Sequence, residues 1–142
     1  MFDKVLVAVD GSESSRGAIE LAKTLLVNGS TKAITLVSVA ALAPVPLEAL
    51  EFVVSEPERL EIVAKTVLEK AAAGFEKDGF KVDTVVLSGD PGTSIAQYAY
   101  DNRFNLIVMG SRGLSGVKGM VLGSVSHNVL HTAHCPVLIY RD

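Results

Sequence analysis

Short, continuously apolar segments alternate along this chain with longer segments in which apolar residues recur at helical spacing. This alternation is the strongest constraint on the fold. Strands that are apolar on both faces need cover on both faces, as in a parallel sheet flanked by helices. Right-handed crossovers then predict an α/β, doubly wound, mostly parallel sheet of five strands. The predicted strands are Lys4–Val9, Ala33–Val39, Val82–Leu87, Leu106–Met109 and Val137–Tyr140.

Four helices are predicted between these strands. Asp90 is expected to cap the third of them, with Pro91 in its first turn, and Ser124 is expected to cap the fourth. Residues 40–57 are predicted to form a long loop with a short helix at Leu47–Val53, either as a functional segment or as a tolerated insertion. The predicted helices are Ser14–Val27, Glu58–Lys77, Pro91–Tyr100 and Ser124–Thr132.

Length and charge restrict the class of protein. The 142 residues, 49% of them apolar, suit one domain over 1–142. No apolar run approaches the ~20 residues of a membrane span, and no signal peptide is recognisable, so a cytoplasmic protein without a membrane partner is expected. The formal charge of −3 argues against a nucleic-acid partner, but it leaves room for a small anion bound at a local positive site.

Cysteine and histidine give little support for metal chemistry. Cys135 is the only cysteine, which rules out an internal disulfide and a zinc cluster, and it is predicted to be a small core residue. His127 and His131 are four residues apart on a predicted helix, a spacing that can bind metal. Because that segment holds no carboxylate partner, solvent-facing histidines are the preferred interpretation, and the same holds for His134.

Ligands of doubly wound sheets bind beyond the carboxyl ends of the strands, where the strand order reverses. The first predicted strand is followed by Asp10-Gly11-Ser12, and the fourth by a segment from Gly110 to Ser124 that holds five of the 12 glycines. Glycine lets backbone N–H groups approach an anion closely, and the start of the following helix favours a phosphate. Arg112 and Lys118 add positive charge. The segment therefore predicts a phosphate-binding site.

Other phosphate motifs are absent from the sequence. No G-x4-G-K-[ST] string occurs, and Asp10-Gly11-Ser12-Glu13 is not a dinucleotide fingerprint. The third predicted strand ends at Ser88-Gly89 rather than at the aspartate that a phosphoacceptor receiver domain needs. A nucleotidyltransferase of related architecture would need a histidine pair near the first strand, and none is present there.

The spacing G-x2-G-x9-G-S, formed by Gly110, Gly113, Gly123 and Ser124, closely resembles the ATP-binding signature of the universal stress protein family. The similarity extends to Val9-Asp10-Gly11-Ser12 and to Cys135-Pro136-Val137-Leu138, so it covers nearly the whole chain. The resemblance implies a Rossmann-like sheet of strand order 3-2-1-4-5. Because the signature is intact, it also implies the branch of the family that binds ATP. Mg²⁺ is expected to accompany the nucleotide, because the ligand is highly anionic and the chain is net acidic.

The resemblance implies a role for each matching residue. Asp10 is expected near the ribose and phosphates, as a magnesium ligand or general base, although it could equally end the strand and bond a nearby N–H. The main chain of Val39 is expected to meet adenine, and Met109 with Gly110 to line the base and ribose pocket. The remaining site residues are Gly113, Gly123, Ser124 and Val125 at the phosphates, and Ala8, Gly11, Ser12 and Arg112, the last without an assigned role.

Two functions remain open at this point. The preferred one is a regulatory module that changes shape or protein partner with ATP; the alternative is a slow ATPase or other phosphoryl-transfer enzyme, with Asp10 as base and Arg112 or Lys118 as cation. Adenine is expected over guanine, because no acidic side chain follows the second strand. A homodimer is expected through the last strand, whose residues Val137, Leu138, Ile139 and Tyr140 carry no charge to guard a sheet edge.

Overall fold

The computed structural model describes residues 1–40, 56–113 and 122–142, with Glu56 and Pro57 described by their backbone alone. A five-stranded sheet of order β3-β2-β1-β4-β5 crosses the protein, and every neighbouring pair is parallel. This confirms the predicted doubly wound architecture and its strand order. The strands are β1 (Phe2–Ala8), β2 (Thr31–Ala40), β3 (Asp83–Ser88), β4 (Leu106–Gly110) and β5 (Val137–Tyr140).

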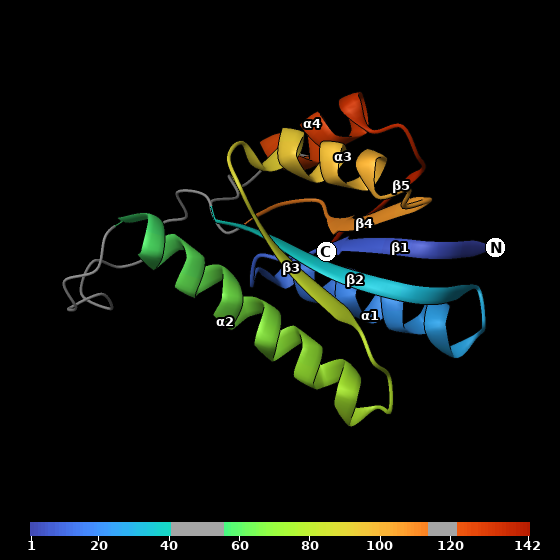
Figure 1. Cartoon of the computed structure of the whole chain (residues 1–142). Coiled ribbons are helices and arrows are strands. Elements are labelled where there is room, and N and C mark those ends of the chain that lie inside the picture. Colours follow the sequence, from blue (N-terminus) through green and yellow to red (C-terminus); the bar gives the residue numbers. More distant parts are fainter. Residues whose placement is uncertain (41–55, 114–121) are drawn as a thin grey trace.

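Helices cover both faces of the sheet (Figure 1). One layer holds α1 (Glu13–Val27) and α2 (Glu56–Lys77), and the opposite layer holds α3 (Pro91–Asp101) and α4 (Ser124–Thr132). Within the described residues, no helix combines the length and apolarity that crossing a membrane requires. The short helix predicted at Leu47–Val53 lies outside the described residues.

The central strand shows why the strand segments are apolar without alternation. Val5, Leu6 and Val7 of β1 are all fully buried, although successive side chains of a strand point to opposite faces. Val5 and Val7 pack into the core under α1 and α2, whereas Leu6 packs with Val129 into the core under α3 and α4. A continuous apolar run is therefore what this position between two helix layers demands.

The helix starts match the predictions at one position and differ at another. The Asp90 carboxylate accepts a hydrogen bond from the Thr93 amide at 3.0 Å, so Asp90 is the N-cap of α3 as predicted. Ser124 does not cap α4: Gly123 takes the N-cap position, and no side chain accepts a hydrogen bond there. The reason is that the Gly123 amide donates to the Ser111 carbonyl at 2.6 Å, which holds Gly123 extended and leaves Ser124 as the first helical residue.

Two helical glycines provide a matched test of the packing. A Cβ on Gly17 of α1 would overlap the Tyr140 ring of β5, whereas a Cβ on Gly74 of α2 would meet only the tip of Lys23, at 3.7 Å. Alanine is favoured over glycine in a helix by about 0.5–1 kcal/mol, while forcing extra atoms into a packed site costs about 1–3 kcal/mol. We expect Gly17→Ala to lower the free energy of unfolding and Gly74→Ala to raise it, as measured by urea denaturation. Equal effects of the two variants would contradict the packing of α1 on β5.

Candidate functional site

The candidate site lies where β1 and β4 end side by side in the middle of the sheet (Figure 1). Val7 of β1 is paired with Val108 of β4, so Asp10 and Ser111 both follow the strand ends at the same edge. From this edge the chain continues into α1 on one face and into α4 on the other. This divergence is the topological switch point at which doubly wound sheets bind their ligands.

The turn after β1 is held by its own polar groups. Asp10 Oδ1 accepts from the Ser12 amide at 2.9 Å, and the Asp10 amide donates to Ser15 Oγ at 3.1 Å. Gly11 adopts a φ of +86°, a conformation that favours glycine. Ser12 then caps α1 by accepting from the Ser15 amide at 3.1 Å. One oxygen of Asp10 is thus committed to the turn, as one of the two interpretations of this residue foresaw.

Two glycines of the signature, Gly110 and Gly113, lie where a side chain would crowd its neighbours. A Cβ on Gly110 would lie 2.5 Å from Ser14 Cβ and 2.6 Å from the Ser14 carbonyl carbon, because the start of α1 packs directly on the end of β4. A Cβ on Gly113 would lie 3.0 Å from Asp10 Oδ2. These contacts give Gly110 and Gly113 a packing role that the sequence interpretation, which considered only nucleotide binding, did not foresee.

Gly123 closes the connection between β4 and α4. Its amide donates to the Ser111 carbonyl at 2.6 Å, and a Cβ on Gly123 would lie 3.4 Å from Arg112 Cα. Ser126 of α4 donates to the Gly110 carbonyl at 2.7 Å and adds a second bond between the two ends. The structure therefore brings the first and last glycines of the signature together, beside the Asp10 turn.

The other predicted site residues occupy the surroundings of this edge. Met109 is buried in the core shared with α3 and α4, and Ala8 and Val125 are half-buried at the border of that core. The Val9 amide donates to the Val37 carbonyl at 2.8 Å, so Val39 lies farther along β2 at the same edge of the sheet. Lys118 lies outside the described residues.

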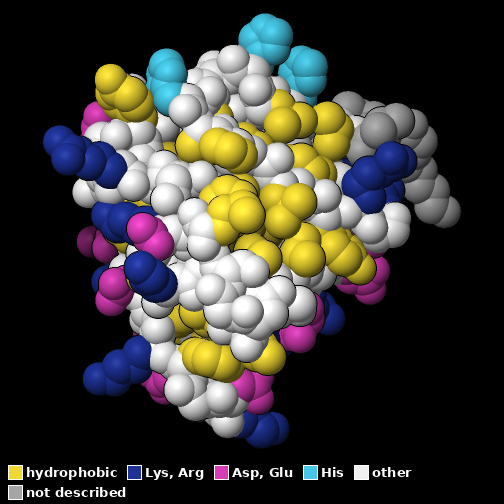
Figure 2. All heavy atoms as spheres, turned by 90° about the vertical axis from the view of Figure 1, so that its right-hand side faces the viewer, with side chains coloured by type: hydrophobic (Ala, Val, Ile, Leu, Met, Phe, Trp, Pro, Cys, Tyr) yellow, Lys and Arg dark blue, Asp and Glu magenta, His cyan; other side chains and the backbone are white. Residues whose placement is uncertain are grey.

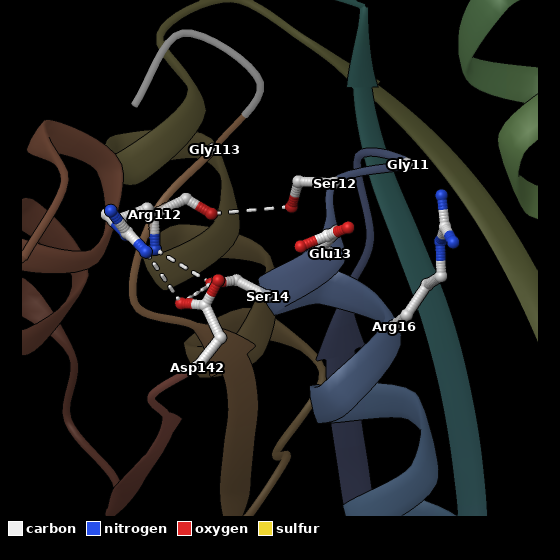
Figure 3. Close-up of a pocket in the computed structure, with 8 residues that line it drawn as sticks. All are labelled: Gly11, Ser12, Glu13, Ser14, Arg16, Arg112, Gly113 and Asp142. Carbon is white, nitrogen blue, oxygen red and sulfur yellow. Dashed lines mark hydrogen bonds and ion pairs between the residues drawn. The ribbon is translucent and has the colours of Figure 1, made fainter. Parts of the chain in front are cut away.

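A cavity of about 310 Å³ opens at the start of α1 (Figure 3). Ser12 Oγ donates to the Arg112 carbonyl across it at 3.3 Å. Arg112 Nη2 donates to Asp142 Oδ1 at 3.1 Å, and Ser14 Oγ donates to the same oxygen at 3.3 Å. The hydrogen bond from Arg112 holds the pKa of the Asp142 carboxyl below its ordinary value. The cavity is lined by Gly11, Ser12, Glu13, Ser14, Arg16, Arg112, Gly113 and Asp142.

Glu13, Ser14, Arg16 and Asp142 were not among the predicted site residues. Ser14 carried a usable signal, because it is a serine in the first turn of a helix that must pack on the sheet. Asp142 carried none, since it reaches the cavity from beyond β5 and its contact with Ser14 spans 128 positions of sequence.

The three histidines face solvent, which was the preferred interpretation of their sequence. His127, His131 and His134 are all exposed, and the rings of His127 and His131 stack at 5.8 Å. No group of three histidine, cysteine or acidic residues in the described ranges is placed to hold a metal ion. Cys135 is half-buried at the margin of a core rather than inside it, and burial raises the pKa of its thiol.

A further groove of about 370 Å³ lies between α1 and α2.

The fold and this edge define a doubly wound α/β protein with a glycine-rich connection after the fourth strand. The model of the universal stress protein family matches residues 1–141, and the chain belongs to that family. It is 36% identical over 151 residues to universal stress protein YxiE of Bacillus subtilis, covering 99% of this chain and 100% of YxiE.

Solved structures of other proteins have the same fold as this chain. MJ0577 of Methanocaldococcus jannaschii superposes with a TM-score of 0.79 at 29% identity, covering 100% of this chain and 97% of that one. A universal stress protein in complex with cAMP has the same fold, with a TM-score of 0.70 at 24% identity over 97% of this chain and 96% of that one.

Two helix caps give a matched test of the site. Ser12 caps α1 at the cavity, and Asp90 caps α3 away from it. Removal of an N-cap side chain costs about 1 kcal/mol, so Ser12→Ala and Asp90→Ala should each lower the free energy of unfolding. Asp90→Ala also removes the hydrogen bond that Asn128 donates to Asp90 Oδ2 at 3.2 Å. Only Ser12→Ala also removes a bond to the Arg112 carbonyl. We expect Ser12→Ala alone to shift the backbone amide resonance of Gly113 in an NMR spectrum; equal shifts in both variants would contradict the coupling of the two loops.

Proposed function

We propose that this protein binds ATP, accompanied by Mg²⁺, at the edge where β1 and β4 end, as a member of the ATP-binding branch of its family. The observation that carries the proposal is the meeting of Gly113, Gly123 and Asp10 at the topological switch point. Gly113 lies against Asp10, and Gly123 lies against the strand end that precedes Gly113. At Gly113 and Gly123 no side chain stands between the backbone and a ligand.

The start of α4 has the chemistry that a phosphate requires. Helices α1 and α3 each have an N-cap side chain that accepts a hydrogen bond, but α4 starts at Gly123 without one. The first amides of a helix have no partner within the helix, and the helix dipole favours an anion there. In the proposed complex, the amides of Ser124 and Val125 bind the phosphates, while the Gly123 amide keeps its hydrogen bond to the Ser111 carbonyl and the absence of a side chain on Gly123 leaves room for the ligand.

Magnesium fits the donor set at the turn after β1. Asp10 Oδ1 accepts from the Ser12 amide, while Oδ2 lies on the side of Gly113. Mg²⁺ prefers oxygen ligands and is commonly held by one or two carboxylates together with substrate phosphates. Asp10 is the residue that would hold it, and the ion would neutralise phosphate charge.

Adenine is proposed to lie along the end of β2, where the main chain of Val39 offers an N–H and a C=O, with Ala8 and Met109 nearby. The same fold accommodates an adenine nucleotide in the cAMP complex; the assignment to this chain rests on its own residues. Guanine would leave a buried polar atom unpaired against that edge, which costs about 1–3 kcal/mol.

The preferred role is a cytoplasmic regulatory module rather than an efficient enzyme. Fast phosphoryl transfer needs a positioned base and a cation at the developing charge. Among the described site residues, one oxygen of Asp10 is committed to its turn, so Asp10 is poorly placed to act as the base. An ATP-dependent change of protein partner is therefore favoured, and slow hydrolysis or phosphoryl transfer is the second candidate.

Calorimetric titration with Mg-ATP and Mg-GTP tests this function. We expect saturable binding of ATP, GTP at least several-fold weaker, and turnover far below the ~1–100 s⁻¹ of kinases. Gly123→Val should abolish binding by placing a branched side chain among the phosphates, and Ser124→Ala should weaken it less, since the amide remains. Gly74→Ala, remote from the site, is the control, and thermal melts establish that each variant is folded. ATP binding unchanged in folded Gly123→Val would place the phosphates elsewhere.

We also propose a homodimer through β5. This strand lies at a sheet edge, and Leu138 and the neighbouring Leu130 of α4 are exposed. Figure 2 shows hydrophobic side chains gathered on one face of the protein below the histidines. The carbonyls of Pro136 and Tyr140 accept from β4, so the N–H of Ile139, on the alternate register, points away from the sheet. Pairing with a second copy would satisfy such groups.

Ile139→Pro removes an outward N–H without removing a hydrogen bond to β4. We therefore expect sedimentation to show a dimer for the unaltered protein at tens of micromolar, roughly the range in which a modest interface persists, and a shift to monomer for Ile139→Pro. Circular dichroism should show that the variant keeps its fold. A monomeric unaltered protein, or a folded variant that dimerises equally well, would refute pairing through this edge.

A further inference from the structure

Arg112 is the cation that the described part of the β4–α4 connection brings to the candidate site. Its guanidinium is already paired with a carboxylate of the protein itself, that of Asp142. Its guanidinium donates to Asp142 Oδ1 at 3.1 Å, and both side chains are about one-third exposed, at 32% and 29%. The pair faces the cavity at the start of α1 and is reachable from solvent (Figure 3). A ligand approaching from that side therefore meets an arginine whose charge is neutralised.

The same oxygen of Asp142 also accepts a hydrogen bond from the hydroxyl of Ser14, which links the first turn of α1 to the segment after β4. Ser14, itself 2% exposed, donates to Asp142 Oδ1 at 3.3 Å and accepts from the Arg112 amide at 3.3 Å. The Ser14 hydroxyl thus donates to an anion and is held in place by the backbone amide of Arg112. A phosphate oxygen in place of Asp142 Oδ1 could accept from both groups.

The charge of the cavity depends on this one residue. Its charged lining consists of Arg16 and Arg112 against Glu13 and Asp142, which sums to zero. Without the side-chain carboxylate of Asp142, the charged side chains of the lining sum to +1. The hydrogen bond from Arg112 lowers the pKa of Asp142, so the carboxylate is charged at neutral pH and competes with an incoming anion.

We propose that Asp142 is a built-in competitor for the terminal phosphate of the nucleotide: its carboxylate occupies Arg112 and Ser14, and the ligand must displace it. This inference rests on the proposed ATP site and concerns its regulation. Displacement releases Asp142, two residues beyond the end of β5, from the start of α1, which would couple the ligand to the β5 edge. The competition weakens ligands in proportion to their use of Arg112, so it sets the preference among ATP, ADP and adenosine.

Asp142→Asn tests the competition, because the amide keeps the size of the carboxylate and loses its charge. We expect Mg-ATP to bind about two- to five-fold more tightly, the range that removing one partly exposed ion pair supports. Adenosine, which has no phosphate, should bind unchanged. In an Arg112→Gln background the gain should vanish, a result that a merely structural role of Asp142 would not produce.

Asp3→Asn is the matched control, since it makes the same change in net charge at an exposed ion pair with Lys32 on the first strand. An equal gain in Asp3→Asn would attribute the effect to net charge and overturn the inference. So would an Asp142→Asn protein that binds ATP no more tightly than the unaltered protein. If ATP binds neither to the unaltered protein nor to Asp142→Asn, the proposed function itself is wrong. If ATP binds to these two proteins equally well, only the proposed competition is wrong.

Discussion

The hydrogen bond from the Gly123 amide to the Ser111 carbonyl, 2.6 Å long, holds the rest of the candidate site together. It brings the start of α4 against the end of β4, and the start of α1 packs on that same strand end at Gly110. Two helix N-termini and two loops thus converge on one point of the sheet edge. A side chain at Gly110 would push α1 away from β4, so this glycine is a packing requirement as well as part of a binding motif.

The sequence predicted the framework because its signals are local. Continuous apolar runs predicted strands that are buried on both faces. Asp90 predicted the start of α3, because an N-cap side chain bonds to an amide of the helix that it begins. The capping role expected of Ser124 was wrong because a tertiary bond to Ser111 decides where α4 begins. Asp142 was beyond prediction for the same reason: its partners Ser14 and Arg112 are distant in sequence, and no periodicity encodes their meeting.

These contacts suggest how one site can serve as a switch. The turn around Asp10 is internally bonded and does not depend on a ligand for its shape. The Arg112–Asp142 pair, in contrast, is partly exposed, and an anion can exchange with its carboxylate at modest cost. In the proposed complex, phosphate would replace the Asp142 carboxylate at Arg112, and this exchange would alter the segment after β5 while the sheet stays in place. In the proposed dimer, the segment after β5 lies next to the interface, so a change in this segment would alter how the protein binds its partner.

The central claim is that the nucleotide binds at the edge where β1 and β4 end. The most direct measurement is an NMR titration of ¹⁵N-labelled protein with Mg-ATP, followed through the backbone amides. The account predicts saturable shifts that are largest at Gly11, Ser12, Gly113, Gly123 and Ser124. Shifts concentrated instead in the groove between α1 and α2, or the absence of any saturable shift, would contradict it.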